Sequence, residues 1–395
     1  RHPDDFHVCV YVFIAACVHF SLYCALFVCT SSCFPFIFGV LIFPLSPSSF
    51  SFLSFQHHCR DGPATASVLK HAYPRFRRCL MMPNLNPPVT TTKLALEYRE
   101  RILSAMKSNG QDPAMFQPLM TLYLTDKTTP EEIKKAAVLK NSDGTSTIVS
   151  CKYYPAGATT NSDFGVTDIK KLYPTLEAMQ EVGMMLCIHS EVTHADIFDR
   201  EPVFIEEIMK PLVEDFKTLK ITMEHISTKE AVDYVLNKAP SNVRASITPQ
   251  HLIYNRNHML VGGIRPHLYC LPILKAEPHR VALAGAATSG SPKFFLGTDS
   301  APHPTYAKQS GCGCAGIFSA HCAVEIYAEV FDEAGHLDRL EDFCSSFGAD
   351  HYGIPRNTDT MTLEKKSWTV PKTYEFGDDT VTPLKAGEEV KWTIL

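Results

Sequence analysis

The sequence predicts an α/β fold built on a parallel sheet. From residue 61 onward, short apolar runs alternate with segments of helical periodicity, and that alternation is typical of βα units. At 395 residues the chain is long enough for one large α/β barrel or two ordinary domains. The count of strands approaches eight if one strand precedes or includes His7, and the sequence contains no internal repeat. These observations favour a single barrel of βα units.

The predicted elements follow one another in the order that such a barrel requires. Apolar runs are predicted as strands at residues 78–82, 116–124, 148–153, 184–189, 219–225, 243–248 and 293–297. Helical patterns lie at 92–108, 130–139, 172–182, 201–219, 228–236 and 320–334. The loop 83–88, rich in proline and asparagine, ends the strand before it. From residue 368 onward we expect a polar, proline-punctuated tail that packs on the outside.

Composition argues against a nucleic-acid partner. The formal net charge is −5, so no strongly basic surface is expected, and small-molecule chemistry is the better default. Five of the 14 cysteines lie in the first 33 residues, and the others are scattered without paired spacing. That scatter is typical of reduced thiols in a cytoplasmic protein. An organellar location stays open, because the chain starts without methionine and we expect a piece of the first strand, and any transit peptide, to lie upstream.

Residues 8–56 form an anomalous apolar insertion that contains no Asp, Glu, Lys or Arg. The run 8–28 has about the length that spans a bilayer as a helix. A signal peptide fits less well, because Asp4 and Asp5 stand just upstream in place of a basic region. A third interpretation is a translated intron, since pyrimidine-rich non-coding DNA encodes Phe, Ser, Leu and Pro. We favour this third interpretation and expect 8–56 to lie outside the fold.

Removal of the insertion would repair a motif. It joins His7 to His57, and the chain then reads His-x-His-x-Arg-Asp-Gly through residue 62. A hydrolase with two metal ions needs a ligand group of this kind near its N-terminus. The split motif therefore supports the view that His7 and His58 belong side by side.

Four further side chains stand at the ends of predicted strands: Lys152, His189, His225 and Asp299. In a parallel βα barrel, catalytic groups gather at these carboxyl ends. Neutral imidazole and carboxylate are good zinc ligands, and a catalytic zinc keeps a position open for water. A lysine ammonium cannot ligate, but its carbamate offers two oxygens that can bridge two metals. Each residue alone is more simply a core histidine, a turn aspartate or a paired lysine, and only their joint placement favours a metal site.

Two thiols one residue apart, Cys312 and Cys314, are a poor zinc site without a second pair. We predict a loop there.

At this point the sequence resembles a known family. The stretches that carry the resemblance are 1–7, 58–62, 82–90, 152–161, 188–194, 224–228, 248–252, 265–272 and 297–303. They are similar to the monofunctional, bacterial and plant-type dihydroorotases of the amidohydrolase superfamily, over nearly the whole chain outside 8–56. The resemblance implies a single-domain (β/α)8 TIM barrel of the metal-dependent amidohydrolase type over 1–395, interrupted by the insertion in its first strand region. It also implies two zinc ions per subunit and reversible cyclisation of N-carbamoyl-L-aspartate to dihydroorotate in pyrimidine synthesis.

The resemblance also implies a role for individual residues. His7, His58 and Asp299 would hold one zinc, His189 and His225 the other, and Lys152, carboxylated on its amino group, would bridge the two. Asp299 would be the general base, moving a proton from the attacking hydroxide to the leaving amide nitrogen. The substrate-binding residues would be Arg60, Asn84 and His303 for its carboxylate, Leu271 and Ala315 for the ring amide, and Thr159 and Thr160 at the tip of a closing loop.

Three departures from the family pattern and two alternative functions follow. The loop 194–198 looks about two residues short of the family pattern, and Ser190 stands where the family often has glycine. The insertion would separate two ligands of one zinc, so we expect the chain as written to be weakly active or inactive. Alternatives are another cyclic amidohydrolase, such as a hydantoinase or dihydropyrimidinase, and a non-catalytic barrel tethered to a membrane by 8–28. Relatives suggest a homodimer.

Overall fold

A computed structural model of the chain describes Val40–Leu41 and residues 52–395. His7 and the run 8–28 lie outside the described residues. The possible membrane helix and the predicted ligand His7 therefore remain predictions. Among the residues that the structure does describe, no helix is long and apolar enough to cross a bilayer.

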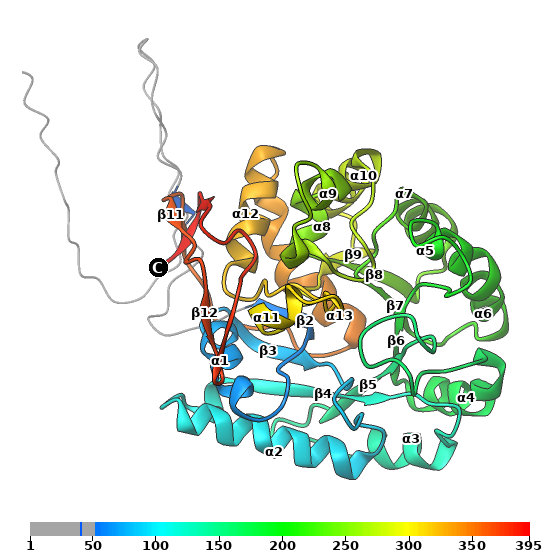
Figure 1. Cartoon of the computed structure of the whole chain (residues 1–395). Helices are drawn as coiled ribbons and strands as arrows, with labels where there is room; N and C mark the ends of the chain where they lie inside the picture. Colours follow the sequence, from blue (N-terminus) through cyan, green and yellow to red (C-terminus); the bar gives the residue numbers. More distant parts are fainter. Residues whose placement is uncertain (1–39, 42–51) are drawn as a thin grey trace, which may run out of the picture. The chain divides into compact units, whose positions relative to one another are not determined.

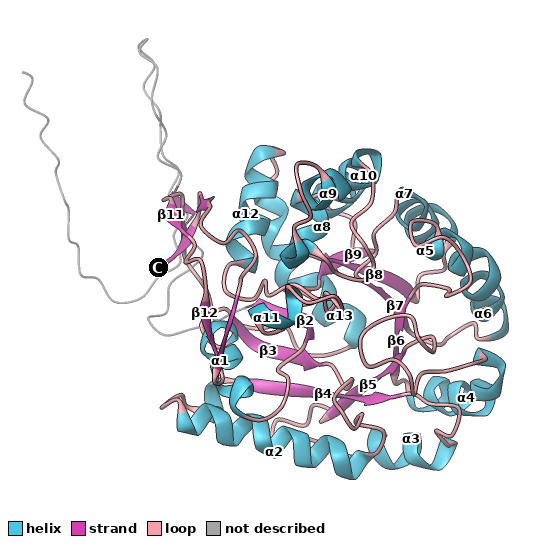
Figure 2. Ribbon diagram, in the orientation of Figure 1, coloured by secondary structure: helices cyan, strands magenta, loops and turns pink. Residues whose placement is uncertain are grey.

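An eight-stranded parallel sheet forms the centre of the described chain and curls into a nearly closed barrel (Figures 1 and 2). Its strands are adjacent in chain order, as expected when each βα unit adds one strand beside the last. They are β2 (Phe52–His57), β3 (Phe76–Met81), β4 (Gln117–Tyr123), β5 (Ile148–Tyr153), β6 (Met185–His189), β7 (Ile221–Glu224), β8 (Val243–Ile247) and β9 (Phe294–Leu296). The predicted α/β barrel is confirmed.

The first and last strands meet through a few contacts instead of a full ladder. The backbone N–H of Thr298 donates to Phe55 O at 2.9 Å, and that of His58 donates to Ser300 O at 3.0 Å. The hydroxyls of Ser54 and Thr298 lie 2.8 Å apart. These contacts join β2 to the residues that follow β9, and so bring His58 next to Asp299.

Helices cover the outside of the barrel (Figure 2). The longer ones are α1 (Pro63–Ala72), α2 (Thr92–Ser108), α3 (Pro130–Ala137), α4 (Tyr173–Val182), α10 (Glu277–Thr288) and α12 (Ala323–Glu333). The shorter ones are α5 (Arg200–Phe204), α6 (Lys210–Asp215), α7 (Lys229–Asp233), α8 (Pro249–Ile253), α9 (Arg256–Leu260), α11 (Thr305–Lys308) and α13 (Phe347–Tyr352). Threonines at 91, 129 and 228 accept a backbone N–H at the starts of α2, α3 and α7, which explains why these starts could be read from sequence.

The strand β2 is made largely of residues that we expected outside the fold. Residues 52–56 of the insertion supply five of its six positions, and Val40–Leu41 forms a short strand, β1, that pairs with β10 (Leu363–Glu364). The rest of 8–56 lies outside the described residues. The C-terminal boundary of the insertion, residue 56, therefore lies within a barrel strand. That the segment is a translated intron stays a prediction.

The C-terminal segment is more than a polar tail. It forms short antiparallel pairs between β11 (Trp368–Thr369) and β14 (Glu389–Val390), and between β12 (Tyr374–Phe376) and β13 (Asp379–Val381). The last strand, β15 (Thr393–Ile394), pairs with β10. Val390 and Trp392 are fully buried. The prediction that this segment packs on the outside of the barrel holds, but it also contributes apolar side chains to the core.

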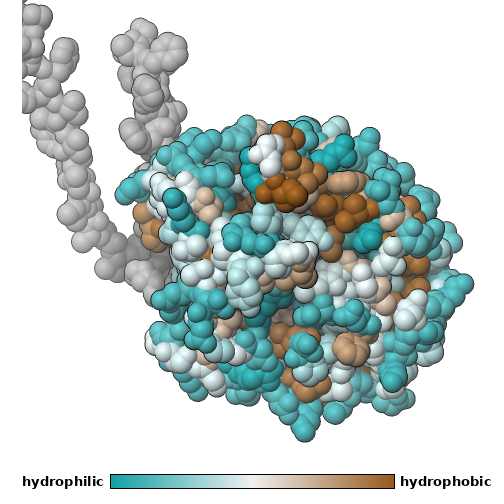
Figure 3. Space-filling model, in the orientation of Figure 1, coloured by the Kyte–Doolittle hydropathy of each residue, from teal (hydrophilic) through white to brown (hydrophobic). Residues whose placement is uncertain are grey.

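On the face drawn in Figure 3, apolar residues gather in the region where Figure 1 places α9. Leu260, Val261 and Ile264, at the end of α9 and just after it, are the exposed large apolar side chains of that stretch. Charged and polar residues cover much of the remaining visible surface. Isolated apolar residues are normal on a protein surface, whereas a cluster of this kind commonly marks a contact site.

The buried histidine His351 should make stability depend on pH. It lies in α13 at the amino-terminal end of the barrel, its Nε2 is 3.1 Å from Ile221 O, and burial lowers its pKa from 6.5 to about 3. The unfolded chain takes up a proton below pH 6.5 while the folded chain does not, so the free energy of unfolding should fall as pH drops from 6.5 toward 3. The loss is at most about 1.4 kcal/mol per pH unit for one group. Denaturation at pH 7 and pH 5 should show a smaller difference for His351→Gln than for the parent, whereas His194→Gln, at an exposed position, should match the parent.

Candidate active site at the carboxyl ends of the strands

A cavity opens at the carboxyl ends of the barrel strands, and the predicted site residues surround it. Those that line it are His58, Arg60, Asn84, Lys152, Thr159, Thr160, His189, His225, Leu271, Asp299 and Ala315. They come from seven of the eight strand ends and from the loops that follow. Of the predicted site residues in the described part of the chain, only His303 does not line the cavity, and it contacts Arg60. The structure thus brings these residues, which are distant in the sequence, to one cavity.

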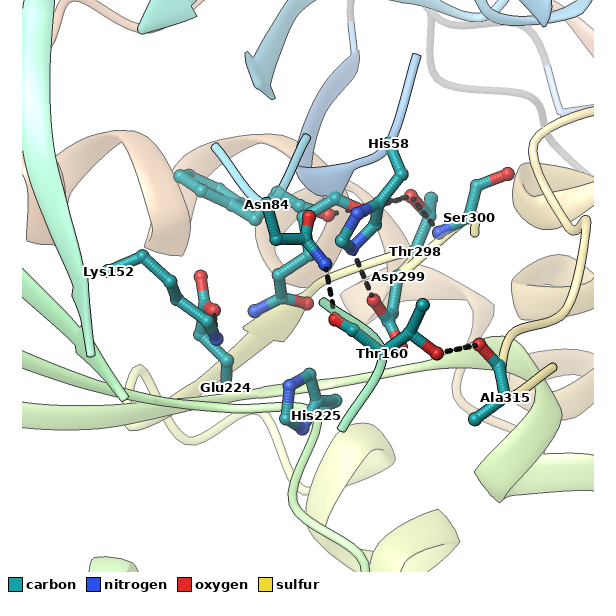
Figure 4. A network of polar contacts seen from close by, with 12 residues as sticks. His58, Asn84, Lys152, Thr160, Glu224, His225, Thr298, Asp299, Ser300 and Ala315 are labelled. Carbon is teal, nitrogen blue, oxygen red and sulfur yellow. Dashed lines mark hydrogen bonds and ion pairs between the residues drawn. The ribbon is translucent and has the colours of Figure 1, made fainter. Parts of the chain in front are cut away.

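The imidazoles and the carboxylate form two pairs. His58 Nε2 lies 3.2 Å from Asp299 Oδ1 (Figure 4), and the rings of His189 and His225 are 4.9 Å apart between centroids. All four side chains are at least nine-tenths buried. His225 and Asp299 have positive φ angles, a conformation that is costly outside glycine and is found mostly where surrounding structure enforces it.

Lys152 lines the same cavity and is bound to an acid that we did not predict. Its Nζ forms a fully buried ion pair with Glu224, the residue before His225 (Figure 4). The positive charge of Lys152 lowers the pKa values of His58, His225 and Asp299, which places it close to both pairs. Carboxylation of Lys152 would turn this cation into an anion, so it requires that the ion pair with Glu224 separate.

Burial dominates the electrostatics of the site. It raises the pKa of Asp299 to about 7, against the opposing effects of Lys152, His189 and Arg60. It also lowers the pKa values of His58 and His225 well below 6.5. The two imidazoles are therefore neutral at physiological pH and carry the lone pairs that a metal ion needs. The Nδ1 atom of His225 is buried without a hydrogen-bond partner in the described chain, as expected of a donor kept for a ligand.

Gln56 occupies the strand position two residues before His58. The end of β2 is irregular, since Gln56 has a positive φ of 56° and the pairing with β3 shifts between Ser54 and His57, and Gln56 lines the cavity together with His58. Its Nε2 donates to Ser246 Oγ at 2.5 Å, while its Oε1 is buried without a partner in the described chain. Gly297 leaves room for this amide, because a Cβ there would collide with Gln56 Oε1. In the repaired motif this position belongs to His7.

The donor set fits metal binding in part. Within residues 52–395, no group of three His, Cys, Asp or Glu side chains is arranged to hold a metal ion. His58 with Asp299, and His189 with His225, each provide two donors and need a third. A carbamate on Lys152 would serve both pairs, and His7 would add a further donor to the first. The chain thus has the donors for the second metal, whereas Gln56 stands at the position of the missing donor for the first.

Arg60 and Asn84 line one side of the cavity, and His303 contacts Arg60. Arg60 Nη2 donates to His303 Nε2 at 2.9 Å, and Arg60 Nε donates to Pro302 O at 2.7 Å. These bonds fix the guanidinium at the mouth of the barrel, next to Asn84. A fixed guanidinium with a neighbouring amide suits a planar anion such as a carboxylate.

The loop that carries Thr159 and Thr160 lies over the cavity. Asn84 Nδ2 donates to Thr160 O at 3.2 Å, and Thr160 Oγ1 donates to Ala315 O at 3.2 Å (Figure 4). Lys308 Nζ donates to Cys314 O and Gly316 O at 2.8 and 2.9 Å, and so fixes the backbone on both sides of Ala315. Cys312 and Cys314 belong to this loop, in agreement with the predicted loop role.

Sequence reasoning missed three polar cavity residues, Gln56, Tyr154 and Glu224, and one acid beside His189, Glu191. Glu224 directly precedes His225, and Glu191 follows His189 by two residues. A buried acid beside a strand-end histidine is therefore the signal that could have found them. Gln56 could have been found by counting back two residues from His58.

The comparisons with known proteins agree with this geometry. No protein-family model matches the chain. The dihydroorotase of Shewanella denitrificans is 56% identical over 340 residues, which cover 86% of this chain and 96% of that protein. The dihydroorotase of Aliivibrio fischeri is 56% identical over 339 residues, 85% of this chain and 96% of that protein.

Solved structures give the same result. The Campylobacter jejuni dihydroorotase has a TM-score of 0.77 and 35% identity, covering 89% of this chain and 99% of that one. The Saccharomyces cerevisiae dihydroorotase in complex with 5-fluoroorotic acid has a TM-score of 0.76 and 30% identity, covering 88% and 97%. An L-hydantoinase from Arthrobacter aurescens, at 16% identity with a TM-score of 0.67, covering 87% and 82%, shares the fold. The chain belongs to the dihydroorotase family.

Proposed function

We propose that this site interconverts dihydroorotate and N-carbamoyl-L-aspartate by hydrolysis and closure of the ring amide. The observation that carries the proposal is the joining of two chemistries in one cavity. A cluster of metal-ligand types, His58, His189, His225 and Asp299, shares the cavity with Arg60 and Asn84. The first set suits attack on an amide carbonyl, and the second suits a substrate that carries a carboxylate.

The carboxylate of the substrate is bound by Arg60, Asn84 and His303. The guanidinium can form a bidentate, charge-assisted pair with it, and the bonds from Arg60 to Pro302 and His303 keep the guanidinium in place before substrate arrives. Backbone groups of Leu271 and Ala315 face the ring amide. This arrangement orients the scissile bond toward Asp299, and such orientation lowers the barrier by removing freedom of motion in advance. The Saccharomyces cerevisiae relative was solved with a pyrimidine carboxylic acid, 5-fluoroorotic acid, which supports this use of the pocket.

Asp299 moves the proton. In hydrolysis its carboxylate takes a proton from the attacking water and delivers it to the amide nitrogen as the ring opens, and ring closure reverses both transfers. The raised pKa of Asp299, about 7, suits a group that must both accept and release a proton near neutral pH. Its neighbour His58, 3.2 Å away, holds one carboxylate oxygen in place.

Two zinc ions complete the proposed site. His58, Asp299 and His7 would hold one, His189 and His225 the other, with carboxylated Lys152 between them. When bound, zinc supplies a water of lowered pKa and polarises the carbonyl. Thr159 and Thr160 close the cavity and exclude bulk water through the bonds from Thr160 to Ala315 and from Asn84 to Thr160. We further propose a homodimer in the cytoplasm.

The test compares two substrates. The chain without residues 8–56, supplied with zinc and bicarbonate, should hydrolyse dihydroorotate and leave dihydrouracil, which lacks the carboxylate, nearly untouched. Arg60→Gln should lower kcat/KM for dihydroorotate about 100-fold, because a charged hydrogen bond contributes roughly 2–3 kcal/mol. Arg101→Gln, which removes an exposed arginine paired with Asp61, should leave it unchanged. Equal turnover of both substrates, insensitive to Arg60, would assign a hydantoinase-like activity instead.

A further inference from the structure

The two histidines of the second proposed metal pair are held differently. His225 has its backbone N–H bound to Ser246 Oγ at 2.9 Å, while its ring Nδ1 has no partner in the described chain. The ring of His189 instead has a dedicated acid: its Nε2 lies 2.8 Å from Glu191 Oε2. The His189 ring is thus held by a carboxylate, whereas the His225 ring has no such contact at Nδ1.

The carboxylate contact is built into the turn that ends β6. After His189 the chain folds back, so that the N–H of Glu191 donates to His189 O at 3.1 Å. This turn points the Glu191 carboxylate at the imidazole two residues earlier. Both side chains are almost completely buried, with 1% and 0% exposure.

A buried cation stands behind the acid. Lys275 Nζ lies 3.9 Å from Glu191 Oε1 and donates to Ile273 O and Ile197 O at 3.2 and 3.4 Å. The Glu191 Oε1 atom has no hydrogen-bond partner in the described chain. Burying a carboxylate is costly unless it is paired. Of the two carboxylate oxygens, Oε2 contacts the His189 ring and Oε1 has no hydrogen bond. The hydrogen bond that stabilises the buried carboxylate is therefore the one that orients the His189 ring.

We propose that Glu191, supported by Lys275, is a positioning residue that sets the tautomer and orientation of His189 for metal binding. An anionic acceptor on Nε2 keeps the proton there and leaves the lone pair on Nδ1, the other ring nitrogen. A carboxylate bound to the far nitrogen of a ligand histidine also makes the ligand more basic. This inference rests on the proposed function, because it assigns His189 as a ligand.

The experiment measures zinc affinity at fixed pH, by competition with a chromophoric chelator, in the full chain. Glu191→Gln keeps the shape of the side chain and removes its charge. It should weaken zinc binding about 10- to 100-fold, the usual effect of losing a partner of this kind. The visible absorption of the Co(II)-loaded protein should change with it, because the ligand field at His189 changes. In the chain without residues 8–56, saturating zinc should restore the kcat of Glu191→Gln, with KM for dihydroorotate unaltered.

The matched control is Glu325→Gln. Glu325 is an equally buried acid on α12, ion-paired with Arg75 and remote from the cavity. It should lower thermal stability as much as Glu191→Gln or more, and leave zinc affinity and the Co(II) spectrum unchanged. The proposal is overturned if Glu191→Gln binds zinc as tightly as the parent, if Glu325→Gln weakens binding equally, or if the parent binds no zinc. Failure to hydrolyse dihydroorotate, with the zinc effect intact, would count against the proposed reaction and leave Glu191 in its role.

Discussion

Replacement of Asp299 by asparagine should lower kcat by about 10³-fold in both directions of the reaction, within the range that a positioned general base contributes. The amide cannot take the proton of the attacking water, and it is a poor metal ligand. Because Asp299 lies in the segment after β9 and is buried beside His58, asparagine fits the same space, and the fold should persist. The measurement is kcat for ring opening and ring closure at saturating zinc and substrate, in the chain without residues 8–56.

Asp126→Asn is the control for this prediction. Asp126 lies on the outer rim of the barrel, where its carboxylate accepts hydrogen bonds from Thr167 and Lys171, and its replacement should leave kcat within about twofold of the parent, as expected of a surface substitution. Circular dichroism should show the same fold for both variants. If Asp299→Asn retained kcat within tenfold of the parent, Asp299 would not be the proton carrier.

Removal of residues 8–56 should raise zinc content from at most one ion per chain to two, and turnover should rise with it. The structure gives the reason: in the chain as written, β2 presents the amide of Gln56 to the cavity at the position where the joined chain presents His7. A neutral amide is a far weaker zinc ligand than an imidazole. Length supports the same view, since alignment with the Shewanella denitrificans relative covers 96% of that protein but 86% of this chain.

A single substitution separates the missing ligand from the added length. Gln56→His in the full chain should restore part of the zinc missing from the His58–Asp299 pair without any deletion, whereas Gln250→His, at another buried amide that lies outside the cavity lining, should restore none. Metal content is measured by elemental analysis after gel filtration, beside initial rates with dihydroorotate. If the full chain and the shortened chain contained equal zinc and turned over equally, the insertion would be harmless and the role given to Gln56 wrong.

The barrel was predictable because its strands are buried on both faces. Such strands read as continuous apolar runs, and β5 and α2 fall at the expected residues. Helix α10 was missed because its buried face consists largely of small residues, such as Ala286 and Ala287, which give little contrast between its two sides. Helix α1 was missed because it buries Thr65 and Ser67, which a periodicity of apolar residues does not register. Strand β2 could not be predicted, because its residues belong to the segment 8–56, which is largely apolar and contains no charged residue to mark where a strand begins.

For the site, the residues that line the cavity could be predicted, but the contacts that hold them could not. Motifs gave the residues that point into the cavity, such as Lys152 and Asp299, because their spacing in the chain is tied to strand ends. The contacts that hold them could not be inferred in the same way. Lys152 pairs with Glu224 and His189 with Glu191. Each contact depends on one acidic residue, and a single residue produces no repeating pattern in the sequence from which its partner could be predicted.

The sparse junction between β2 and the residues after β9 has a mechanical consequence. His58 lies on one margin of the curled sheet and Asp299 on the other, and in the described chain a few backbone hydrogen bonds join the two margins. A metal ion bound by both side chains, as proposed above, would join these two margins, so that metal binding and closure of the barrel would be coupled.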